Sequence, residues 1–548
     1  MACSKICSGD LPELINEVIQ YFRYDYKTLH SCILVNRLWC HLAIPLLWED
    51  PFSNPTKNYH FIEIYLCFLN EDGKAKFNEY GINNLLLSNK LFNYPSFIKY
   101  LDTNKICNSI KYWVDTLMDK YDDNLKNLVY RSLFEVFIEN EGSLHSFEAV
   151  LSIGNSCNYF SNNMDLILQN PNLINNIRGL TFRGFGTLSQ NIIPFLKLLY
   201  SNCNSISSII INFPKYIFMI DNYPLIEKCL TQIIISQHNL KKISFGSFVK
   251  LYNPFLSLKT SNCSNTLNTI IFYLINFKNI INILQEVFDH LNVLESIHLI
   301  YCEYLNSDSI QQIIKVTKPF KLKTLIMSEI IHIESLLLLL QKFGDCLENF
   351  GFGNIDEIID EYNEPKRQLF EFITKYCKKI RYFESGLPDD NNTYLFIKNN
   401  QHNINYLTIE ADFHDHYAVY NVSSTVLRNL GQVLPSKLEY LCLTLIFTTN
   451  DLEIFLKNSQ NTFIKKLLIK QIIVDEDENI DISFYIKKYI MKKERVKYLA
   501  ILKEDFDDKE LFFLKDEVNE FKLHNIVVQK YNNLHIDTYS YVNNYLQY

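Results

Sequence analysis

The residue types best suited to chemistry gather in one short run, Asp412, His414, Asp415 and His416. Two imidazoles and a carboxylate could bind a divalent metal ion. The run follows an apolar stretch that ends at Ile409, where polar loop residues are ordinary, and no further ligand group is near it in the sequence. We favour a solvated loop here and predict no metal site.

Other patterns typical of enzymes are missing from the sequence. The two Gly-Phe-Gly tripeptides, at 184–186 and 351–353, extend neither to a phosphate-binding loop nor to a dinucleotide fingerprint. There is no Gly-x-Ser-x-Gly elbow, and no cysteine is paired with a histidine in a known catalytic frame. We therefore expect no enzymatic activity, no catalytic residue and no cofactor.

Composition narrows the classes of protein to which this chain could belong. The chain has 548 residues, more than one compact domain usually holds, and 48% of them are hydrophobic. Lys and Arg number 53 against 61 Asp and Glu, so the net charge of −8 gives no reason to expect nucleic-acid binding. There is no signal-peptide pattern, no apolar run long enough to span a membrane, and no C-x-x-C pair among the 14 cysteines. We expect a cytoplasmic or nuclear protein with reduced thiols and no membrane association.

Three short helices are predicted in the first fifty residues. Apolar residues recur at helical spacing over 14–22 and again over 29–35, and a third run around Trp39 is expected to stop at Pro45. Asp10 is the expected N-cap of the first helix. A piece this small buries little core and is marginal without a partner.

The same segment resembles the F-box. The family pattern is a Leu-Pro pair, an acidic residue, an apolar helix, Val-x-Arg-x-Trp, a small residue and a closing Leu-Trp pair. It is matched in order by Leu11, Pro12, Glu13, Val35, Arg37, Trp39, Ala43, Leu47 and Trp48, with Asn36 where many members carry Cys. The resemblance implies docking to a Skp-type adaptor and, through it, to a cullin–RING ubiquitin ligase. By the same resemblance, the adaptor-facing positions are Leu11, Pro12, Ile15, Leu29, Val35 and Trp39.

A second pattern, apolar-x-x-apolar-x-apolar, recurs thirteen times from Ile177 to Val528 with a mean spacing of about 29 residues, and a degenerate earlier copy begins at Leu144. Helical apolar faces separate the copies. One short strand and one helix per unit is the leucine-rich-repeat pattern, and it resembles the cysteine-containing type found behind F-boxes. We therefore predict an α/β fold, a leucine-rich-repeat solenoid with a parallel concave sheet and outer helices.

The predicted organisation has three parts, an F-box over 9–52, a helical connector over 53–140 and the repeat array over 141–548. The connector shows helical runs at 61–68 and 109–118, and its Trp113 is expected in the core. It has no Gly/Ser-rich or Pro-rich linker character, so we expect it to hold the F-box and the array together rigidly.

A column of tyrosines is predicted on the concave face of the array. The third residue of each apolar frame points away from the core, and four of these residues are Tyr382, Tyr406, Tyr440 and Tyr498. Tyrosine is 35 of 548 residues, so thirteen positions would hold about one by chance. Together with the flanking Glu384 and Glu410, we expect them to bind a target, because tyrosine gives rigid contact area with a polar tip. The alternative is that tyrosine merely suits strands.

Together the two resemblances predict the substrate-recognition subunit of an SCF-type ubiquitin ligase, in which the repeats bind an unknown target protein. The alternative is an adaptor-bound repeat scaffold that sequesters partners without degradation. As a substrate receptor, the chain would bring a target lysine near the transfer machinery and would contribute no side-chain chemistry of its own.

Overall fold

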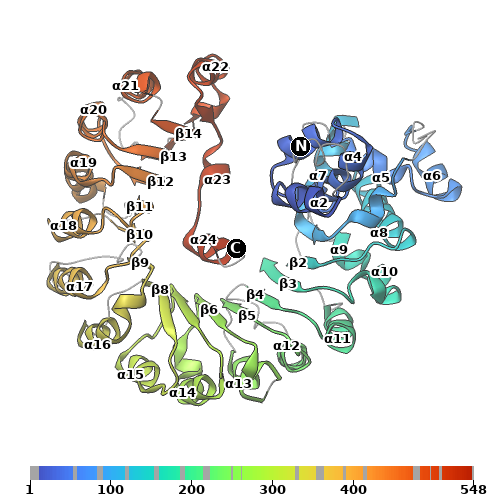
Figure 1. Cartoon of the computed structure of the whole chain (residues 1–548), viewed down its shortest axis with the longest axis horizontal. Coiled ribbons are helices and arrows are strands. Elements are labelled where there is room, and N and C mark those ends of the chain that lie inside the picture. Colours follow the sequence, from blue (N-terminus) through green and yellow to red (C-terminus); the bar gives the residue numbers. More distant parts are fainter. Residues whose placement is uncertain are drawn as a thin grey trace. The chain divides into compact units, whose positions relative to one another are not determined.

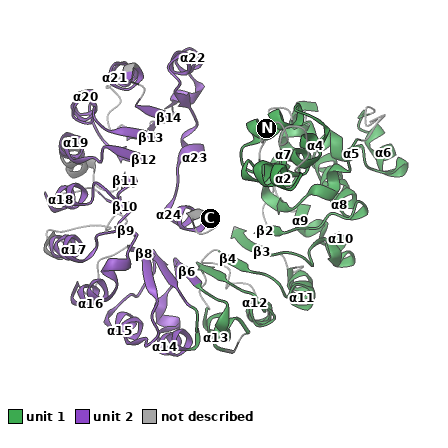
Figure 2. Cartoon of the chain, in the orientation of Figure 1, with its two compact units in different colours: residues 1–268, 290–293 green, residues 269–289, 294–548 purple. Residues whose placement is uncertain are grey.

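The computed structural model describes residues 12–53, 59–82, 91–117, 122–152, 159–185, 192–213, 223–247, 251–260, 262–327, 333–352, 363–386, 391–410, 416–472, 482–493, 495–504 and 509–545. The chain forms two compact units, residues 1–268 with 290–293 and residues 269–289 with 294–548 (Figure 2). Both units are α/β, as predicted, and the division between them falls inside the predicted repeat array. Among the described residues, no helix is both long and apolar enough to cross a lipid bilayer.

The first unit begins with helices and continues as alternating strands and helices (Figure 1). Its strands are β1 (Tyr100–Asp102), β2 (Ser146–Ser152), β3 (Gly179–Phe185), β4 (Ser208–Asn212) and β5 (Lys242–Gly246). Its helices are α2 (Pro12–Tyr21), α3 (Tyr26–Ile33), α4 (Arg37–Leu47), α5 (Phe61–Leu66), α6 (Glu71–Asn78), α7 (Thr103–Leu117), α8 (Asp123–Glu139), α9 (Tyr159–Asn162), α10 (Met164–Gln169), α11 (Ile192–Asn202), α12 (Tyr223–Ile235) and α13 (Tyr252–Thr260). The strands pair in chain order and run parallel.

Helices α2, α3 and α4 occupy the first fifty residues, where three helices were predicted. Asp25 caps α3 by accepting from the Thr28 backbone N–H, and Asn36 caps α4 in the same way from Trp39. The expected stop at Pro45 is wrong, because α4 continues to Leu47. A proline near the end of a helix removes only one backbone donor and leaves the last turn intact. The expected cap Asp10 lies outside the described residues.

The connector predicted over 53–140 is not purely helical. Its strand β1 pairs in parallel with β2 and so belongs to the same sheet as the array. Three residues are too few to show an alternating pattern in the sequence. The expected helices are present as α5 and α7, and Trp113 is buried with its indole N–H donating to Glu63.

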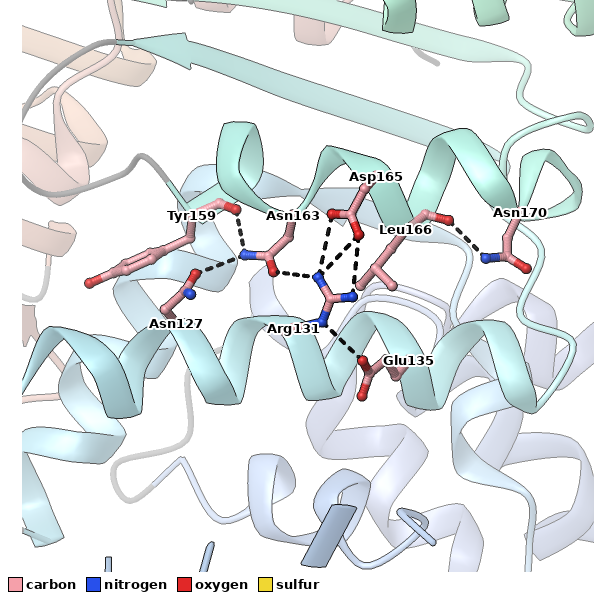
Figure 3. A network of polar contacts seen from close by, with 8 residues as sticks. All are labelled: Asn127, Arg131, Glu135, Tyr159, Asn163, Asp165, Leu166 and Asn170. Atoms are coloured by element: carbon pink, nitrogen blue, oxygen red, sulfur yellow. Dashed lines mark hydrogen bonds and ion pairs between the residues drawn. The ribbon is translucent and has the colours of Figure 1, made fainter. Parts of the chain in front are cut away.

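A polar network joins α8 of this connector to α9 and α10 of the array (Figure 3). The Arg131 guanidinium donates to Asp165 at 3.2 Å and to Glu135 at 3.1 Å. The Asn163 amide donates to Asn127 and to the Tyr159 carbonyl, both at 2.8 Å. Side chains of α8 are therefore linked to α10 and to the segment that joins α9 to α10.

The second unit continues the alternation. Its strands are β6 (Thr269–Tyr273), β7 (Ser296–Ile300), β8 (Lys321–Met327), β9 (Asn349–Phe352), β10 (Tyr382–Ser385), β11 (Tyr406–Glu410), β12 (Lys437–Leu445), β13 (Phe463–Ile472), β14 (Val496–Glu504), β15 (Lys509–Glu510) and β16 (Val527–Val528). Its helices are α14 (Ile281–His290), α15 (Ser307–Lys315), α16 (Ile333–Phe343), α17 (Asn363–Tyr376), α18 (Asn391–Asn399), α19 (His416–Val433), α20 (Thr449–Asn458), α21 (Ser483–Tyr489), α22 (Lys515–Leu523), α23 (Tyr531–Leu534) and α24 (Thr538–Tyr545). From β6 to β14 neighbouring strands pair in chain order and run parallel. Strand β15 is antiparallel to β14, and β16 is parallel to it.

The apolar frames found in the sequence form the core between strands and helices. Their apolar residues are buried in every described frame but the last, where Leu523 is 83% exposed. The predicted position of the last frame, which began at Leu523, is therefore wrong. Leu523 is the last residue of α22, not part of a strand. The strand begins four residues later, at Val527, which pairs with Tyr498. A short helical run and a short strand both carry apolar residues, so spacing alone did not separate them.

Candidate functional site

The six positions expected to face an adaptor divide into inward and outward residues. Ile15 and Leu29 are fully buried in the small core that holds α2, α3 and α4 together, so neither offers surface to a partner. Pro12 and Val35 are exposed. Trp39 is half-buried against the same core, and its buried indole N–H makes no hydrogen bond to any described residue. Leu11 lies outside the described residues.

Part of the two apolar faces predicted over 14–22 and 29–35 is exposed rather than buried. Leu14, Val18 and Tyr21 stand four and three residues apart on α2, so they share one face of that helix. They are 46%, 44% and 87% exposed, and Leu34 and Val35, just before α4, are 79% and 55% exposed. We call these five residues the N-terminal apolar surface. Exposed apolar residues that share one helix face, as the three on α2 do, mark interaction sites more often than isolated ones do.

The helix cluster is attached to the rest of the first unit just after α4. The Trp48 ring packs on Tyr65 and Tyr94, with centroid distances of 5.2 and 4.3 Å. The Glu49 carboxylate lies 3.0 Å from the Arg23 guanidinium. Burial nevertheless raises the pKa of Glu49 to about 7, because desolvation outweighs the attraction of Arg23.

The predicted tyrosine column is present in the second unit. Tyr382 pairs with Tyr406, Tyr406 pairs with Tyr440, and Lys466 stands between Tyr440 and Tyr498 in the same register. The first three rings stack, with centroids 6.4 and 6.1 Å apart. Register and face were therefore predicted correctly from the repeat spacing.

The expectation that this column is a free surface is wrong, because the end of the chain lies on it. We call residues 529–543 the C-terminal strap; it contains α23 and most of α24. Helices α14–α21 lie on one side of the strands and the strap on the other (Figure 1). Tyr382 and Tyr440 are buried, and Tyr406 is half-buried. Tyr541 of the strap packs on Tyr382 and Tyr406, with centroid distances of 4.8 and 4.6 Å.

Hydrogen bonds hold the strap along its length. At one end the Gln529 N–H donates to the Leu499 carbonyl at 2.9 Å. In the middle the Ile536 N–H donates to the Tyr440 hydroxyl at 3.1 Å. Further on, the Tyr539 ring stacks on Tyr273 of β6 at 4.2 Å. The strap therefore covers the unit from β14 to β6.

Glu384, which was expected to bind a target, instead accepts a hydrogen bond from the strap. Its carboxylate accepts from the Tyr382 hydroxyl at 2.9 Å, and from the hydroxyls of Tyr301 and Thr538. The carboxylate is buried, and this burial raises the pKa of Glu384. A carboxyl with three hydroxyl neighbours and almost no solvent contact has little capacity left to bind a target.

Glu410 also meets the strap. Its carboxylate lies 3.6 Å from Nε2 of His535, and this interaction raises the pKa of the imidazole. The buried thiol of Cys442, on the neighbouring strand, lies 3.3 Å from the Tyr531 hydroxyl. Burial raises the pKa of Cys442 to about 12.

The strap was missed in the sequence because it follows the last apolar frame and has no repeat spacing. Its contact residues are Tyr531, Leu534, Ile536, Tyr539, Tyr541 and Val542. Six apolar or aromatic residues within twelve positions were the only sign in the sequence that this segment packs against another part of the chain. Of the loop first considered for a metal site, Asp412, His414 and Asp415 lie outside the described residues, as does the side chain of His416.

Neither a scan against protein-family models nor a search of curated proteins finds a match to this chain.

Proposed function

We propose that this chain is the substrate-recognition subunit of an SCF-type ubiquitin ligase, acting in the cytoplasm or nucleus. In this proposal α2, α3 and α4 are an F-box that docks to a Skp-type adaptor, and the strand–helix units are leucine-rich repeats that hold a target protein. The supporting observation is the N-terminal apolar surface. It lies on the segment that carries the Leu-Pro and Val-x-Arg-x-Trp pattern, and each of its five residues is at least 44% exposed.

The structure of the helix cluster refines which residues would meet the adaptor. Ile15 and Leu29 hold the three helices together, so their effect on binding would be indirect. Of the positions implied by the resemblance, Pro12, Val35 and Trp39 are proposed to contact the adaptor directly. We add Leu14 and Val18, which are exposed on α2. Burying such residues against a partner removes apolar area from water, which is the main favourable term in association.

The strap bears on where a target would bind. It occupies the tyrosine column through stacking and hydrogen bonds, so a target can reach that face only after the strap leaves. Because the strap is part of the same chain, its effective concentration is high and a free ligand competes poorly with it. Target recognition on the rest of the repeat surface requires no such release.

Adaptor binding by purified protein tests the proposal. Val35→Asp places a charge on the proposed interface. Truncation of a hot-spot residue costs about 2–4 kcal/mol, so we expect affinity to fall by about 100-fold or more. Leu338→Asp, at a 48% exposed position on α16 of the second unit, is the matched control and should bind normally. Equal affinity of the Val35→Asp variant and the wild type, with both folded, would refute the F-box proposal.

The scaffold alternative is separated by a second measurement. Ligase subunits and co-purifying proteins are quantified from cells with and without proteasome inhibition. A substrate receptor predicts partners whose abundance rises on inhibition in cells with the wild type, but not with Val35→Asp. Partners that bind equally in all four conditions and never change in abundance would favour sequestration without degradation.

A further inference from the structure

Strand register brings a carboxylate and a thiol together on the strap-covered face of the second unit. Glu410 ends β11 and pairs with Thr444 of β12, while Cys442 pairs with Thr408. Residues two apart on a strand share a face, so Thr408 and Glu410 lie on the face of the tyrosine column, as does Cys442 on β12. Neighbouring strands are about 4.8 Å apart, so the three side chains are close neighbours.

The strap adds an imidazole to this pair. His535 follows α23, and its ring stacks on that of Tyr531 with centroids 5.7 Å apart. The Tyr531 hydroxyl is itself 3.3 Å from Sγ of Cys442 and 3.3 Å from the Thr444 hydroxyl, which fixes the position of α23 over β12. One ligand atom from each of Glu410, Cys442 and His535 lies within 4.8 Å of the other two.

We propose that Glu410, Cys442 and His535 bind a Zn²⁺ ion that fastens the C-terminal strap to the sheet. Sulfur, imidazole nitrogen and carboxylate oxygen are the three donor types that zinc takes in proteins, whereas Mg²⁺ and Ca²⁺ prefer oxygen alone. Zinc–ligand bonds of about 2.0–2.3 Å place tetrahedral ligand atoms about 3–4 Å apart. The 3.6 Å between His535 and Glu410 already has this spacing. The Cys442 sulfur lies within 4.8 Å of both ligand atoms, so a shift of about 1 Å would bring it to the same spacing.

A separate observation points to the fourth ligand. The Thr408 hydroxyl is buried beside Cys442 and makes no hydrogen bond to any described residue. A buried hydroxyl without a partner is costly. A zinc ion with three protein ligands keeps a fourth position for water, and a water in that position would give Thr408 its partner.

The consequence is a metal-dependent closure of the tyrosine column. Two ligands come from neighbouring strands and one from the strap, so the ion crosslinks segments that are 93 residues apart between Cys442 and His535. Binding requires the thiolate, so the Cys442 proton is released to solvent as the Zn–S bond forms. The ion binds only when the strap lies on the sheet, so by mass action it stabilises that state over the one in which the strap is released. This inference does not depend on adaptor binding.

Cobalt(II) titration of the full chain tests the site directly, because a thiolate bound to Co²⁺ gives a near-ultraviolet charge-transfer band. We expect one equivalent of Co²⁺ to produce this band and Zn²⁺ to displace it. Cys442→Ser should abolish the band. Cys377→Ser, which changes another buried thiol of the same unit, should leave it unchanged.

His535→Gln keeps the experiment decisive if the Cys442 variant fails to fold, since His535 lies on the strap and its side chain is 34% exposed. We expect it to keep the thiolate band but to bind Co²⁺ more than about 100-fold more weakly, since even second-shell changes cost 10–100-fold. Hydrogen exchange in residues 531–543 should slow on addition of Zn²⁺ in the wild type and in Cys377→Ser only. Wild-type protein without a thiolate band, or Co²⁺ uptake with an unchanged band in Cys442→Ser, would overturn the proposal.

Discussion

Two apolar surfaces of this chain carry the sequence patterns most typical of binding, and only one of them is open. On α2 the side chains of Leu14, Val18 and Tyr21 are exposed. In the second unit Tyr382 and Tyr440 stand in the predicted column but are buried beneath the strap. A regular spacing of apolar or aromatic residues therefore identifies a face, but it does not say whether the chain itself covers that face.

The difference has a physical basis in what each surface offers a neighbour. The tyrosine column combines rings with hydroxyls, so a segment that lies on it gains both stacking and hydrogen bonds, such as that from Ile536 N–H to Tyr440. The N-terminal apolar surface offers aliphatic contact without matching polar groups, apart from Tyr21. Covering it would remove apolar area from water but would form few hydrogen bonds.

The largest effect that would sharpen this comparison is expected for Tyr440→Ala. This change removes a fully buried ring and the acceptor of the Ile536 N–H, so we expect a loss of about 3–5 kcal/mol in the local stability of β12 and the strap. Hydrogen exchange of those peptides measures it. Tyr498→Ala, at a half-buried position in the same register, should cost about 1 kcal/mol. Equal costs for the two variants would mean that the strap does not protect the column.

The next effect contrasts the two sides of α2. Ile15→Ala should destabilise the first unit by about 2–4 kcal/mol, since the side chain is fully buried. Leu14→Ala, its exposed neighbour, should change stability by less than about 0.5 kcal/mol. All three tryptophans, Trp39, Trp48 and Trp113, lie in the first unit, so urea unfolding followed by tryptophan fluorescence reports on that unit. A large loss with Leu14→Ala would show that α2 is covered in solution.

A smaller effect depends on pH and concerns how the helix cluster is attached. The pKa of Glu49 is about 7 in the folded chain against an ordinary 4.5, so between these values the folded state holds more protons than the unfolded state. Stability of the first unit should therefore fall as the pH rises from about 4.5 to 7, by about 1–2 kcal/mol from this carboxyl. Glu49→Gln should flatten most of that slope.

The residual slope in that variant has a known source. Burial also raises the pKa of Asp50, which would keep part of the dependence on pH. The measurement is urea unfolding at several pH values, again by tryptophan fluorescence. An undiminished slope in Glu49→Gln would assign the pH dependence to other groups.

The smallest effect concerns the junction shown in Figure 3. Arg131 and Asp165 are both partly exposed, so their ion pair is screened by solvent. We expect Arg131→Met to cost about 0.5–1 kcal/mol in the first unit. Lys111→Met, at an exposed position on α7, is the control and should be neutral. A cost above about 2 kcal/mol would mean that the network, rather than apolar packing, holds α8 against α10.

Much of the architecture could be predicted from spacing alone. The apolar frames from Ile177 to Ile501 are buried as expected, and the register of Tyr382, Tyr406 and Tyr440 follows from them. The frame at Leu523 was misplaced by the end of a helix, and β1 was too short to recognise. Of the candidate binding residues, Val35 is exposed, whereas Ile15, Leu29, Tyr382 and Tyr440 are buried.

The sequence by itself determined the alternation of strands and helices, the buried face of each strand and the positions that repeat along the sheet. These follow from local periodicity, because a strand or helix must bury its apolar face wherever it packs. Only the tertiary structure decided which repeated face stays open. The strap reaches Tyr382 from Thr538, 156 residues along the chain, and brings His535 to Glu410 and Cys442. Contacts between segments so distant in sequence leave no periodic trace, since each depends on where the folded sheet places its partner.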